Sequence, residues 1–371
     1  LSTMMDIPLS LTRILEYGAS VHGSTTVTTW HGEGTGSEFD PAEEVTFRDI
    51  AARAAAFAHA IHDDLGITGD ERVGSFMWNC AEHLEVMFGT ACKGAIFAPL
   101  NKQLMNDQIR HIINHAEISA IVCDPRLAQQ LGKVLVGTDS VKSVIITGAQ
   151  PAQQFAHLFP RGIEVYSYEA LIDGRSTVYD WPELDERTAA ALCYSTGTTG
   201  APKGVLYSHR SLYLEAMQLR SSDSLCITHG ETFLCCIPIC HVLSWGVPFT
   251  CFMTGTPLVL PDADVSAPTL AKAIAATSPR VAHGVPTIWI QLFVHYMHHP
   301  PERMTLTEIY AGGSPVPPTL IKMWEERYGV DVVHVWGMVE TSTVGSVARP
   351  PQGASGDTRW AYRISQGRIC L

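Results

Sequence analysis

Strand-like and helix-like segments alternate along almost the whole of this 371-residue chain. Short apolar runs, typical of buried strands, are followed by longer stretches whose apolar residues recur at helical spacing. This alternation is typical of α/β proteins, in which helices and sheets pack as layers around a common core. It predicts a layered α/β fold, and the length allows one large domain or two to three subdomains.

The expected elements form two series, separated by a polar, turn-rich stretch at 174–187. In the first series we expect helices at 46–65, 81–93 and 106–115 and strands at 72–77, 95–99, 119–124 and 143–147. In the second we expect strands at 189–193, 232–237, 257–260, 280–284, 308–311 and 331–336 and helices at 209–220, 267–277, 286–297 and 317–328. Two subdomains, 1–185 and 186–371, follow from this division, and residues 32–44, rich in Gly and Glu, are expected to form an exposed loop.

Composition narrows the class of protein. The chain is 46% hydrophobic and 17% charged, which is typical of a globular enzyme, and its net charge is −12. Because Lys and Arg form no cluster, nucleic acid is not expected to be a partner. The first residues contain no signal peptide, and the ten cysteines lie mostly in apolar runs, as reduced thiols of cytoplasmic proteins do. Cys235, Cys236, Cys240 and His241 match no zinc-binding spacing.

Residues 234–260 contain no Lys, Arg, Asp or Glu and are long enough to span a bilayer. Pro238, Pro248 and Pro257 would break any helix there, so a buried strand, a turn and a core helix are expected and no transmembrane segment. A lipid-facing role, as a peripheral membrane contact, is the alternative.

A Gly- and Thr-rich loop follows the strand expected at 189–193. It carries four hydroxyls, two glycines and a lysine: Ser195, Thr196, Gly197, Thr198, Thr199, Gly200 and Lys203. Such a loop brings backbone N–H groups, hydroxyls and an ammonium to an anion, so it predicts a polyphosphate-binding site. It is not a Walker loop, because Lys203 stands three residues after Gly200 instead of directly after a glycine. A simple turn is the alternative.

Three later stretches carry further polar or aromatic groups. Residues 239–248 place His241 in an apolar run, residues 311–315 read Ala-Gly-Gly-Ser-Pro at a strand end, and residues 335–342 place Trp336 near Glu340. Ligands of open α/β sheets lie beyond the carboxyl ends of strands, so these stretches are candidate binding segments. Judged alone, His241 is more typical of a hydrogen-bonded core histidine, and Trp336 is more typical of plain core packing.

The four stretches, in this order and spacing, resemble the AMP-forming adenylate synthetases. Residues 2–6, 207–209 and 284–289 are similar to those of medium- and long-chain fatty acyl-CoA synthetases. The likeness covers essentially the whole chain. It implies the large N-terminal domain of that family, with two mixed or parallel sheets, flanking helices and a small β part. It also implies that the small C-terminal domain with its catalytic lysine is missing after Leu371, which would leave this fragment impaired or inactive.

The resemblance implies a ligase that uses ATP, Mg²⁺ and coenzyme A. A fatty acid attacks the α-phosphorus of ATP to give an acyl-adenylate and pyrophosphate, and coenzyme A then displaces AMP. Such transfer depends on positioning and charge neutralisation. A homodimer is also implied. The alternatives are a nucleotide- or acyl-binding module without turnover, and an acyl-AMP ligase or adenylation domain that loads a carrier protein.

The same likeness assigns roles to individual residues. His241, Lys203 and Glu340 would be catalytic, Ser195 and Glu340 would hold the metal, and His241, Trp245, Gly284 and Gly313 would contact the acid. The nucleotide would contact residues Ser195, Thr196, Gly197, Thr198, Thr199, Gly200, Lys203, Val242, Gly312, Gly313, Ser314, His334, Val335, Trp336, Gly337 and Val339. Trp245 is expected to gate an acyl tunnel.

Two details of the sequence modify these expectations. The family usually has Thr before the motif glutamate, but this chain has Val339, which lacks the hydroxyl that would contact a phosphate. No Asp or Glu occurs between Phe233 and Pro261 or at 281–294, so an acid with a charged ammonium would find no partner in those segments. An uncharged, apolar acid is therefore expected in preference to an amino acid, and the resemblance implies a medium or long chain.

Overall fold

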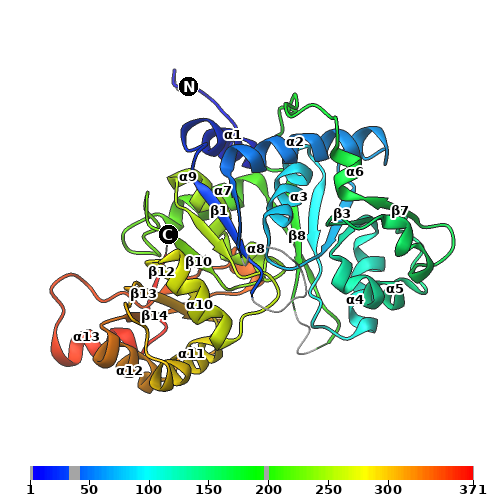
Figure 1. Ribbon diagram of the computed structural model, residues 1–371. Coiled ribbons are helices and arrows are strands. Elements are labelled where there is room, and N and C mark those ends of the chain that lie inside the picture. The colour runs from blue at the N-terminus through cyan, green and yellow to red at the C-terminus, as the bar shows by residue number, and fades with distance from the viewer. Residues whose placement is uncertain (1–2, 33–41, 196–199, 371) are drawn as a thin grey trace. The chain divides into compact units, whose positions relative to one another are not determined.

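The computed structural model describes residues 3–32, 42–195 and 200–370, and the chain forms two compact units (Figure 1). Unit 1 comprises Leu1–Ser20, Arg48–Met77 and Glu82–Leu214, and unit 2 comprises Val21–Phe47, Trp78–Ala81 and Glu215–Leu371. Each unit is built on one sheet, so the expected α/β layering with two sheets and flanking helices is confirmed. The units differ from the subdomains expected at 1–185 and 186–371, because segments of the first half complete the sheet of unit 2.

The sheet of unit 1 has seven strands in the order β7-β6-β5-β3-β4-β8-β9. They are β3 (Arg72–Phe76), β4 (Ile96–Pro99), β5 (Ile118–Cys123), β6 (Ser143–Ile146), β7 (Glu164–Ser167), β8 (Ala189–Tyr194) and β9 (Gly204–Ser208). Neighbouring strands are parallel, except that β8 and β9 form an antiparallel pair. The helices of the first half of the chain are α1 (Leu11–Val21), α2 (Phe47–Asp63), α3 (Ala81–Cys92), α4 (Asn106–Ala116), α5 (Ala128–Leu135) and α6 (Tyr168–Ile172). The helix α7 (His209–Leu219) begins in unit 1 and ends in unit 2.

The sheet of unit 2 has nine strands in the order β16-β15-β14-β13-β12-β10-β11-β1-β2. They are β1 (Thr26–Trp30), β2 (Ala42–Thr46), β10 (Phe233–Cys235), β11 (Leu258–Leu260), β12 (Val281–Gly284), β13 (Glu308–Gly312), β14 (Asp331–Trp336), β15 (Ser346–Val347) and β16 (Arg368–Ile369). The strands from β14 to β1 are parallel, and antiparallel strands lie at both edges. The helices are α8 (Val242–Trp245), α9 (Val247–Thr254), α10 (Ala267–Thr277), α11 (Pro286–His298), α12 (Pro318–Tyr328) and α13 (Gly356–Arg363).

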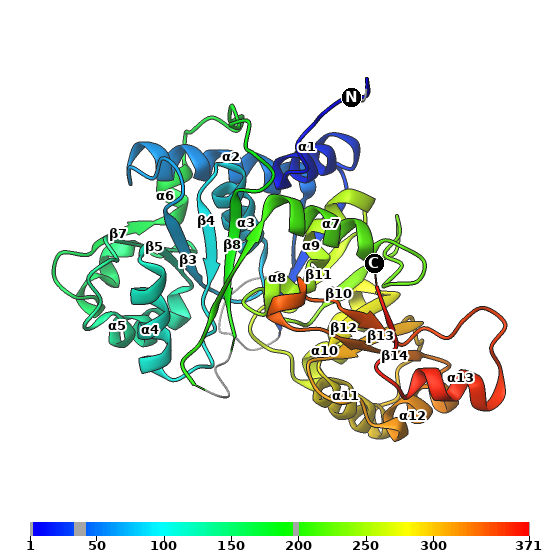
Figure 2. The ribbon, with the colours of Figure 1, turned by 180° about the vertical axis from the view of Figure 1, so that it is seen from behind.

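Three helices cover one face of the sheet of unit 2. In both views α10, α11 and α12 lie side by side against the strands (Figures 1 and 2). Their apolar residues share one buried cluster with Leu234, Val259, Ala282, Ile309 and Val332 of the strands. Because successive strand residues point to opposite faces, His283 and Tyr310 point away from these helices. The opposite face of the sheet is therefore where polar side chains reach the carboxyl ends of the strands.

Most expected elements are confirmed to within one or two residues. The unexpected elements of the described chain are four helices (α1, α5, α6 and α13), the inner strand β1, and several strands at or near the sheet edges. The expectation that residues 32–44 form an exposed loop is wrong for Ala42–Thr46, which pairs with β1 as an antiparallel edge strand. Residues 33–41 of that expected loop lie outside the described residues. An edge strand can keep polar residues on its exposed sides. With Glu43 and Glu44 in its centre, this segment lacks the apolar alternation by which a strand is predicted.

The apolar stretch 234–260 consists of β10, the short helices α8 and α9, and β11, with the segments that join them. The buried strand, turn and core helix expected there are confirmed. Within the described residues, no helix combines the length and apolar character that crossing a membrane requires.

Candidate active site

The Gly- and Thr-rich loop connects the antiparallel strands β8 and β9 in unit 1. The loop is closed at its base by Ser195 and Lys203: the Ser195 amide donates to the Lys203 carbonyl at 2.9 Å, and the Lys203 amide donates to the Ser195 Oγ at 3.2 Å. The Tyr194 ring lies against Gly204 one residue further down, and its hydroxyl is 2.7 Å from His115 Nδ1. The described ends of the loop are thus held together by the antiparallel pair β8 and β9.

The ammonium of Lys203 is exposed, as is Gly200, so both can reach a ligand in solvent. Thr196, Gly197, Thr198 and Thr199 lie outside the described residues. Ser195, Gly200 and Lys203 are therefore the described members of the predicted phosphate site.

The remaining predicted residues lie in unit 2, and several are at the ends of neighbouring parallel strands. Gly284 ends β12, Gly312 ends β13 and Trp336 ends β14, and the register pairs Gly284 with Ala311 and Gly312 with Val335. The strand order changes direction here, because β11 follows β10 on one side while β12 lies on its other side. Such a switch point leaves a crevice beyond the carboxyl ends of the strands, where open α/β sheets bind ligands.

The segment that leaves β10 at this switch point carries His241 and Trp245. Asn79, which is buried, holds its first residues: its Nδ2 donates to the carbonyls of Ile237 (2.8 Å) and Cys235 (3.3 Å), and its Oδ1 accepts from the Ile239 amide (3.0 Å). His241 is partly exposed in this segment, and its place in the site stays a prediction. Asn79 was missed in the sequence analysis. The only indication in the sequence was a polar amide side chain within an apolar run, far along the chain from residues 239–248.

The next four residues, Val242 to Trp245, all adopt left-handed backbone conformations, with φ between 48° and 58°, before Gly246 at 72°. The indole of Trp245 is buried and comes close to Gly312: a Cβ added there would lie 2.9 Å from Trp245 Cη2 and 2.4 Å from the Val335 carbonyl oxygen. Gly312 therefore has to be glycine for Trp245 to lie beside the ends of β13 and β14.

Trp336 lies in a different environment. Its indole is 40% exposed, so the alternative of plain core packing is wrong. One edge of the ring rests on Gly345, where an added Cβ would come within 2.7 Å of Trp336 Cζ3, and the Gly345 amide donates to the Trp336 carbonyl at 2.9 Å. The ring is thus fixed by the backbone and keeps an exposed surface on which a planar base can stack.

The other predicted residues of unit 2 vary in exposure. Gly313, Ser314 and Glu340 are exposed, Gly337 and Val339 are partly exposed, and Val242, Val335 and His334 are buried. His334 Nδ1 is 3.0 Å from the Ser365 carbonyl, and burial lowers the pKa of this imidazole. Val242 is joined to the segment after Trp336 through its carbonyl, which accepts from the Thr343 hydroxyl at 3.4 Å.

Glu340 lies in the short 3₁₀ turn η4 (Val339–Thr341), where its carboxylate is free to reach a bound group. Ser195, the other predicted metal ligand, belongs to unit 1. Across the described ranges, no three His, Cys, Asp or Glu side chains gather as a metal site. Hydroxyl and carboxylate oxygens are each ligands that suit Mg²⁺, an ion that takes most of its oxygens from water and phosphate.

Glu215 is a buried acid that sequence reasoning missed. It lies on the last turns of α7, and its carboxyl group packs on Gly246, where an added Cβ would lie 2.9 Å from Glu215 Cδ. Neither oxygen has a hydrogen-bond partner of standard geometry among the described residues. Burial raises its pKa to about 8, and the Thr343 hydroxyl and Val344 amide offset this only partly. The acid is therefore neutral at neutral pH and adds no charge beside Trp245.

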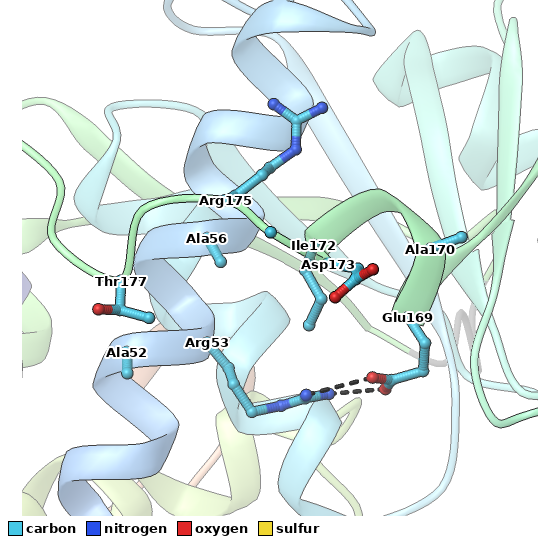
Figure 3. A pocket seen from close by; sticks show the side chains of 10 residues that line it. Ala52, Arg53, Ala56, Glu169, Ala170, Ile172, Asp173, Arg175 and Thr177 are labelled. Carbon is cyan, nitrogen blue, oxygen red and sulfur yellow. Dashed lines mark hydrogen bonds and ion pairs between the residues drawn. The ribbon is translucent and has the colours of Figure 1, made fainter.

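A separate pocket in unit 1 is lined by none of the predicted site residues (Figure 3). It has a volume of about 480 Å³ and is lined by residues of α2 and α6 and the turn after α6. Its Arg53 is paired with Glu169 at 2.7 Å and with the buried Glu85 at 2.8 Å. Its two arginines, Arg53 and Arg175, are already paired with acidic residues of the protein, so this pocket is not a candidate for the predicted ligands.

Comparisons with known proteins identify the chain. Residues 17–370 match the family described as AMP-binding enzyme. A medium-chain-fatty-acid–CoA ligase from Ectopseudomonas oleovorans is 32% identical over 374 residues, which cover 99% of this chain and 66% of that protein. The chain belongs to the AMP-binding enzyme family.

Other relatives of this AMP-binding enzyme act on different acids. A 3-methylmercaptopropionyl-CoA ligase from Ruegeria lacuscaerulensis is 33% identical over 94% of this chain and 63% of its own length. The crystal structure of an anthranilate CoA ligase with anthranoyl-AMP has the same fold, with a TM-score of 0.83 and 18% identity over 99% of this chain and 64% of that one. The chain spans about two-thirds of the length of these curated relatives.

Proposed function

We propose that this protein activates a carboxylic acid with ATP, forming an acyl-adenylate and pyrophosphate, and that the whole protein passes the acyl group to coenzyme A. The observation that carries the proposal is the set of glycines and aromatic rings at the carboxyl ends of β12, β13 and β14, in a chain that belongs to the AMP-binding enzyme family. The names of two relatives support coenzyme A as the acceptor of the acyl group, because both proteins are named as acyl-CoA ligases.

The roles of the residues follow from their chemistry. Lys203, with Ser195 and Gly200 and the Thr196–Thr199 hydroxyls and amides, would hold the triphosphate tail, and Trp336 would stack on adenine beside Gly312, Gly313 and Ser314. Mg²⁺, when bound, would neutralise phosphate charge and would be held by Ser195 and Glu340. His241 would orient the carboxylate toward the α-phosphate. Val242, His334, Val335, Gly337 and Val339 would shape the nucleotide site around these groups.

For the acid, we propose a medium- or long-chain fatty acid. Trp245 and Gly284 would border the acyl chain with Gly313, and the neutral Glu215 would leave that region without a formal charge. A relative that acts on a medium-chain fatty acid supports this choice, whereas the relative named for 3-methylmercaptopropionate extends the range toward short thioether acids. We further propose that the protein is a cytoplasmic homodimer. We also propose that it does not bind nucleic acid, and its net charge of −12 supports this last point.

The test is acid-dependent exchange of labelled pyrophosphate into ATP, measured with this chain and Mg²⁺ across saturated acids from butanoate to palmitate. We expect exchange that requires both the acid and Mg²⁺ and that is greatest for a medium or long chain. Binding of ATP and acid in calorimetry without any exchange would instead identify a binding module. The whole protein with free coenzyme A, compared with a carrier protein, separates a CoA ligase from a carrier-loading enzyme.

Lys203→Met tests the phosphate loop. Removing the ammonium should lower the exchange rate about a hundredfold, because the charge it neutralises increases as pyrophosphate departs. Lys133→Met, which changes an exposed lysine of α5 in the same unit, is the matched control and should keep the wild-type rate. Equal rates in the two variants would contradict the proposed role of the loop.

A further inference from the structure

The turn that carries Trp245 is strained. Four consecutive residues without glycine, Val242 to Trp245, are left-handed, and each such residue costs about 1–2 kcal/mol relative to a right-handed one. A run of this kind persists only where surrounding contacts fix it, and such strain is concentrated at functional sites. The contacts that fix this turn therefore determine where the Trp245 indole lies.

His283 supplies the central contact. It lies on β12, on the face opposite to α10–α12, and is completely buried. Its Nε2 is 3.2 Å from the Ser244 Oγ and 3.1 Å from the Ser244 carbonyl oxygen. The Ser244 hydroxyl already donates its hydrogen to the Ile237 carbonyl at 2.7 Å. Both Ser244 oxygens are thus acceptors, and the proton of the neutral imidazole must be on Nε2.

The imidazole of His283 also holds the indole directly. The two ring centroids are 5.2 Å apart at 78°, an edge-to-face contact, and the far edge of the indole reaches Gly312. Phe233 makes a second edge-to-face contact with His283, with centroids 5.2 Å apart at 87°. Trp245 is thus fixed through its backbone at Ser244 and through its ring.

A purely structural residue at this position would not need to be histidine. The His283 Nδ1 is buried without a partner among the described residues, and an unpaired buried acceptor is destabilising. A phenylalanine of similar size would fill the same space without that unpaired atom. What the imidazole adds is the Nε2–H that holds Ser244, and burial keeps it neutral by lowering its pKa to about 4.

We propose that His283 is a positioning residue that fixes the Trp245 indole and thereby determines which acyl chains the protein accepts. This inference rests on the proposed function, in which Trp245 borders the acyl chain. With the N–H in place, the indole keeps one position and admits a narrow range of acids. Without it, the turn relaxes toward right-handed conformations, the indole moves, and discrimination between acids of different length is lost.

The experiment compares His283→Phe, which keeps the ring and loses the N–H, with His283→Gln, which keeps a side-chain N–H donor. We measure kcat and KM for pyrophosphate exchange with acids from butanoate to palmitate. In H283F we expect the ratio of kcat/KM between the best and the worst acid to fall about tenfold, through changes in KM. The reason is that one methylene more or less in an apolar pocket changes kcat/KM by a factor of about this size. For the best acid, kcat should stay within about twofold of the wild type, and H283Q should restore most of the wild-type profile.

A spectroscopic readout separates positioning from stability. The emission of Trp245 is obtained as the difference between each protein and its Trp245→Phe counterpart. In H283F this difference emission should shift to the red and become more accessible to acrylamide, while in H283Q it should match the wild type. Should H283F fail to fold, Ser244→Ala removes one of the two acceptors of the same N–H and is expected to flatten the profile by a smaller factor.

An H283F protein that is folded and keeps both the chain-length profile and the Trp245 emission of the wild type would overturn this inference while leaving the proposed function intact. If the wild-type protein showed no pyrophosphate exchange with any of the acids tested, the proposed function would be overturned instead. This outcome does not depend on the emission of Trp245 in H283F.

Discussion

At the scale of single residues, the site depends on positions where a side chain would be too large. Gly312 leaves room for the Val335 carbonyl and for the Trp245 indole, and Gly345 leaves room for the ring of Trp336. Gly246 does the same for the carboxyl group of Glu215, and its φ of 72° suits glycine. None of the three glycines is next in sequence to the group that it makes room for, so this role is apparent only from the contacts.

The first prediction concerns Val339, which stands where the family usually has Thr. A hydrogen bond to a charged group contributes about 1.5–3 kcal/mol, so restoring the hydroxyl should stabilise the transition state. Val339→Thr is expected to raise the rate of pyrophosphate exchange about tenfold with little change in the KM for the acid. Val339→Ala, which removes bulk and adds no hydroxyl, is the control. An equal gain in both variants would show that space, not the hydroxyl, limits the rate.

At the scale of elements, the segment between β10 and α9 is placed by contacts from outside its own sequence. Asn79 makes hydrogen bonds to Cys235, Ile237 and Ile239, and the Thr343 hydroxyl reaches the carbonyl of Val242. The helix periodicity of this stretch is short and irregular, and its left-handed turn follows no common sequence pattern. Tertiary hydrogen bonds thus fix the element that carries both His241 and Trp245.

We expect Asn79→Ala to lower the free energy of unfolding by about 3 kcal/mol, because the Cys235 carbonyl and the Ile239 amide lose their bonds to Asn79 and the Ile237 carbonyl keeps only its bond from Ser244. It should also raise the KM for the acid, since the segment that follows would no longer be held. Asn114→Ala on the exposed side of α4 loses only a long, exposed bond to Gly137 and should change the stability by less than about 0.5 kcal/mol. Urea denaturation and exchange kinetics measure both effects, and similar stabilities for the two variants would contradict the role of Asn79.

At the scale of the whole molecule, buried titratable groups link stability to pH. Burial raises the pKa of Glu215 in unit 2 and of Glu85 in unit 1 to about 8, and it lowers the pKa of His283 and His209 to about 4. A folded chain thus keeps carboxyl protons that the unfolded chain releases above its ordinary pKa of 4.5. Its buried imidazoles also stay neutral in the pH range below 6.5 in which the imidazoles of the unfolded chain become protonated.

Between pH 6.5 and 8, the folded chain holds more protons than the unfolded chain on the two carboxyl groups and on His31, whose pKa the carboxylates of Asp262 and Glu43 raise to about 9. The free energy of unfolding should therefore fall as the pH rises. Glu215→Gln removes one of these groups, and the stability of this variant relative to the wild type should increase with pH over that range. Denaturation midpoints at a series of pH values test this expectation. Parallel profiles of the two proteins would mean that Glu215 is already ionised in the folded state.

Much of the fold could be predicted because its elements carry strong local signals. The helix at 267–277 and the strand at 331–336 have the expected bounds, since apolar periodicity, an N-terminal proline and flanking turn residues all act within a few residues. The edge strands β2 and β9 could not be predicted, because one or both of their faces are exposed and their pairing is with distant segments. The predicted site motifs of unit 2 were placed correctly at strand ends for the same local reason.

The sequence by itself determined the α/β layering, the Gly- and Thr-rich loop after the strand at 189–193, and the glycines and aromatic ring at the carboxyl ends of β13 and β14, because periodicity and residue type are local properties. Only the tertiary structure decided that β1 and β2 complete the sheet of unit 2, that Asn79 holds the segment before His241, and that His283 and Glu215 lie against the turn of Trp245. These contacts join residues far apart in the chain, and packing and burial, which no local pattern encodes, decide which of them form.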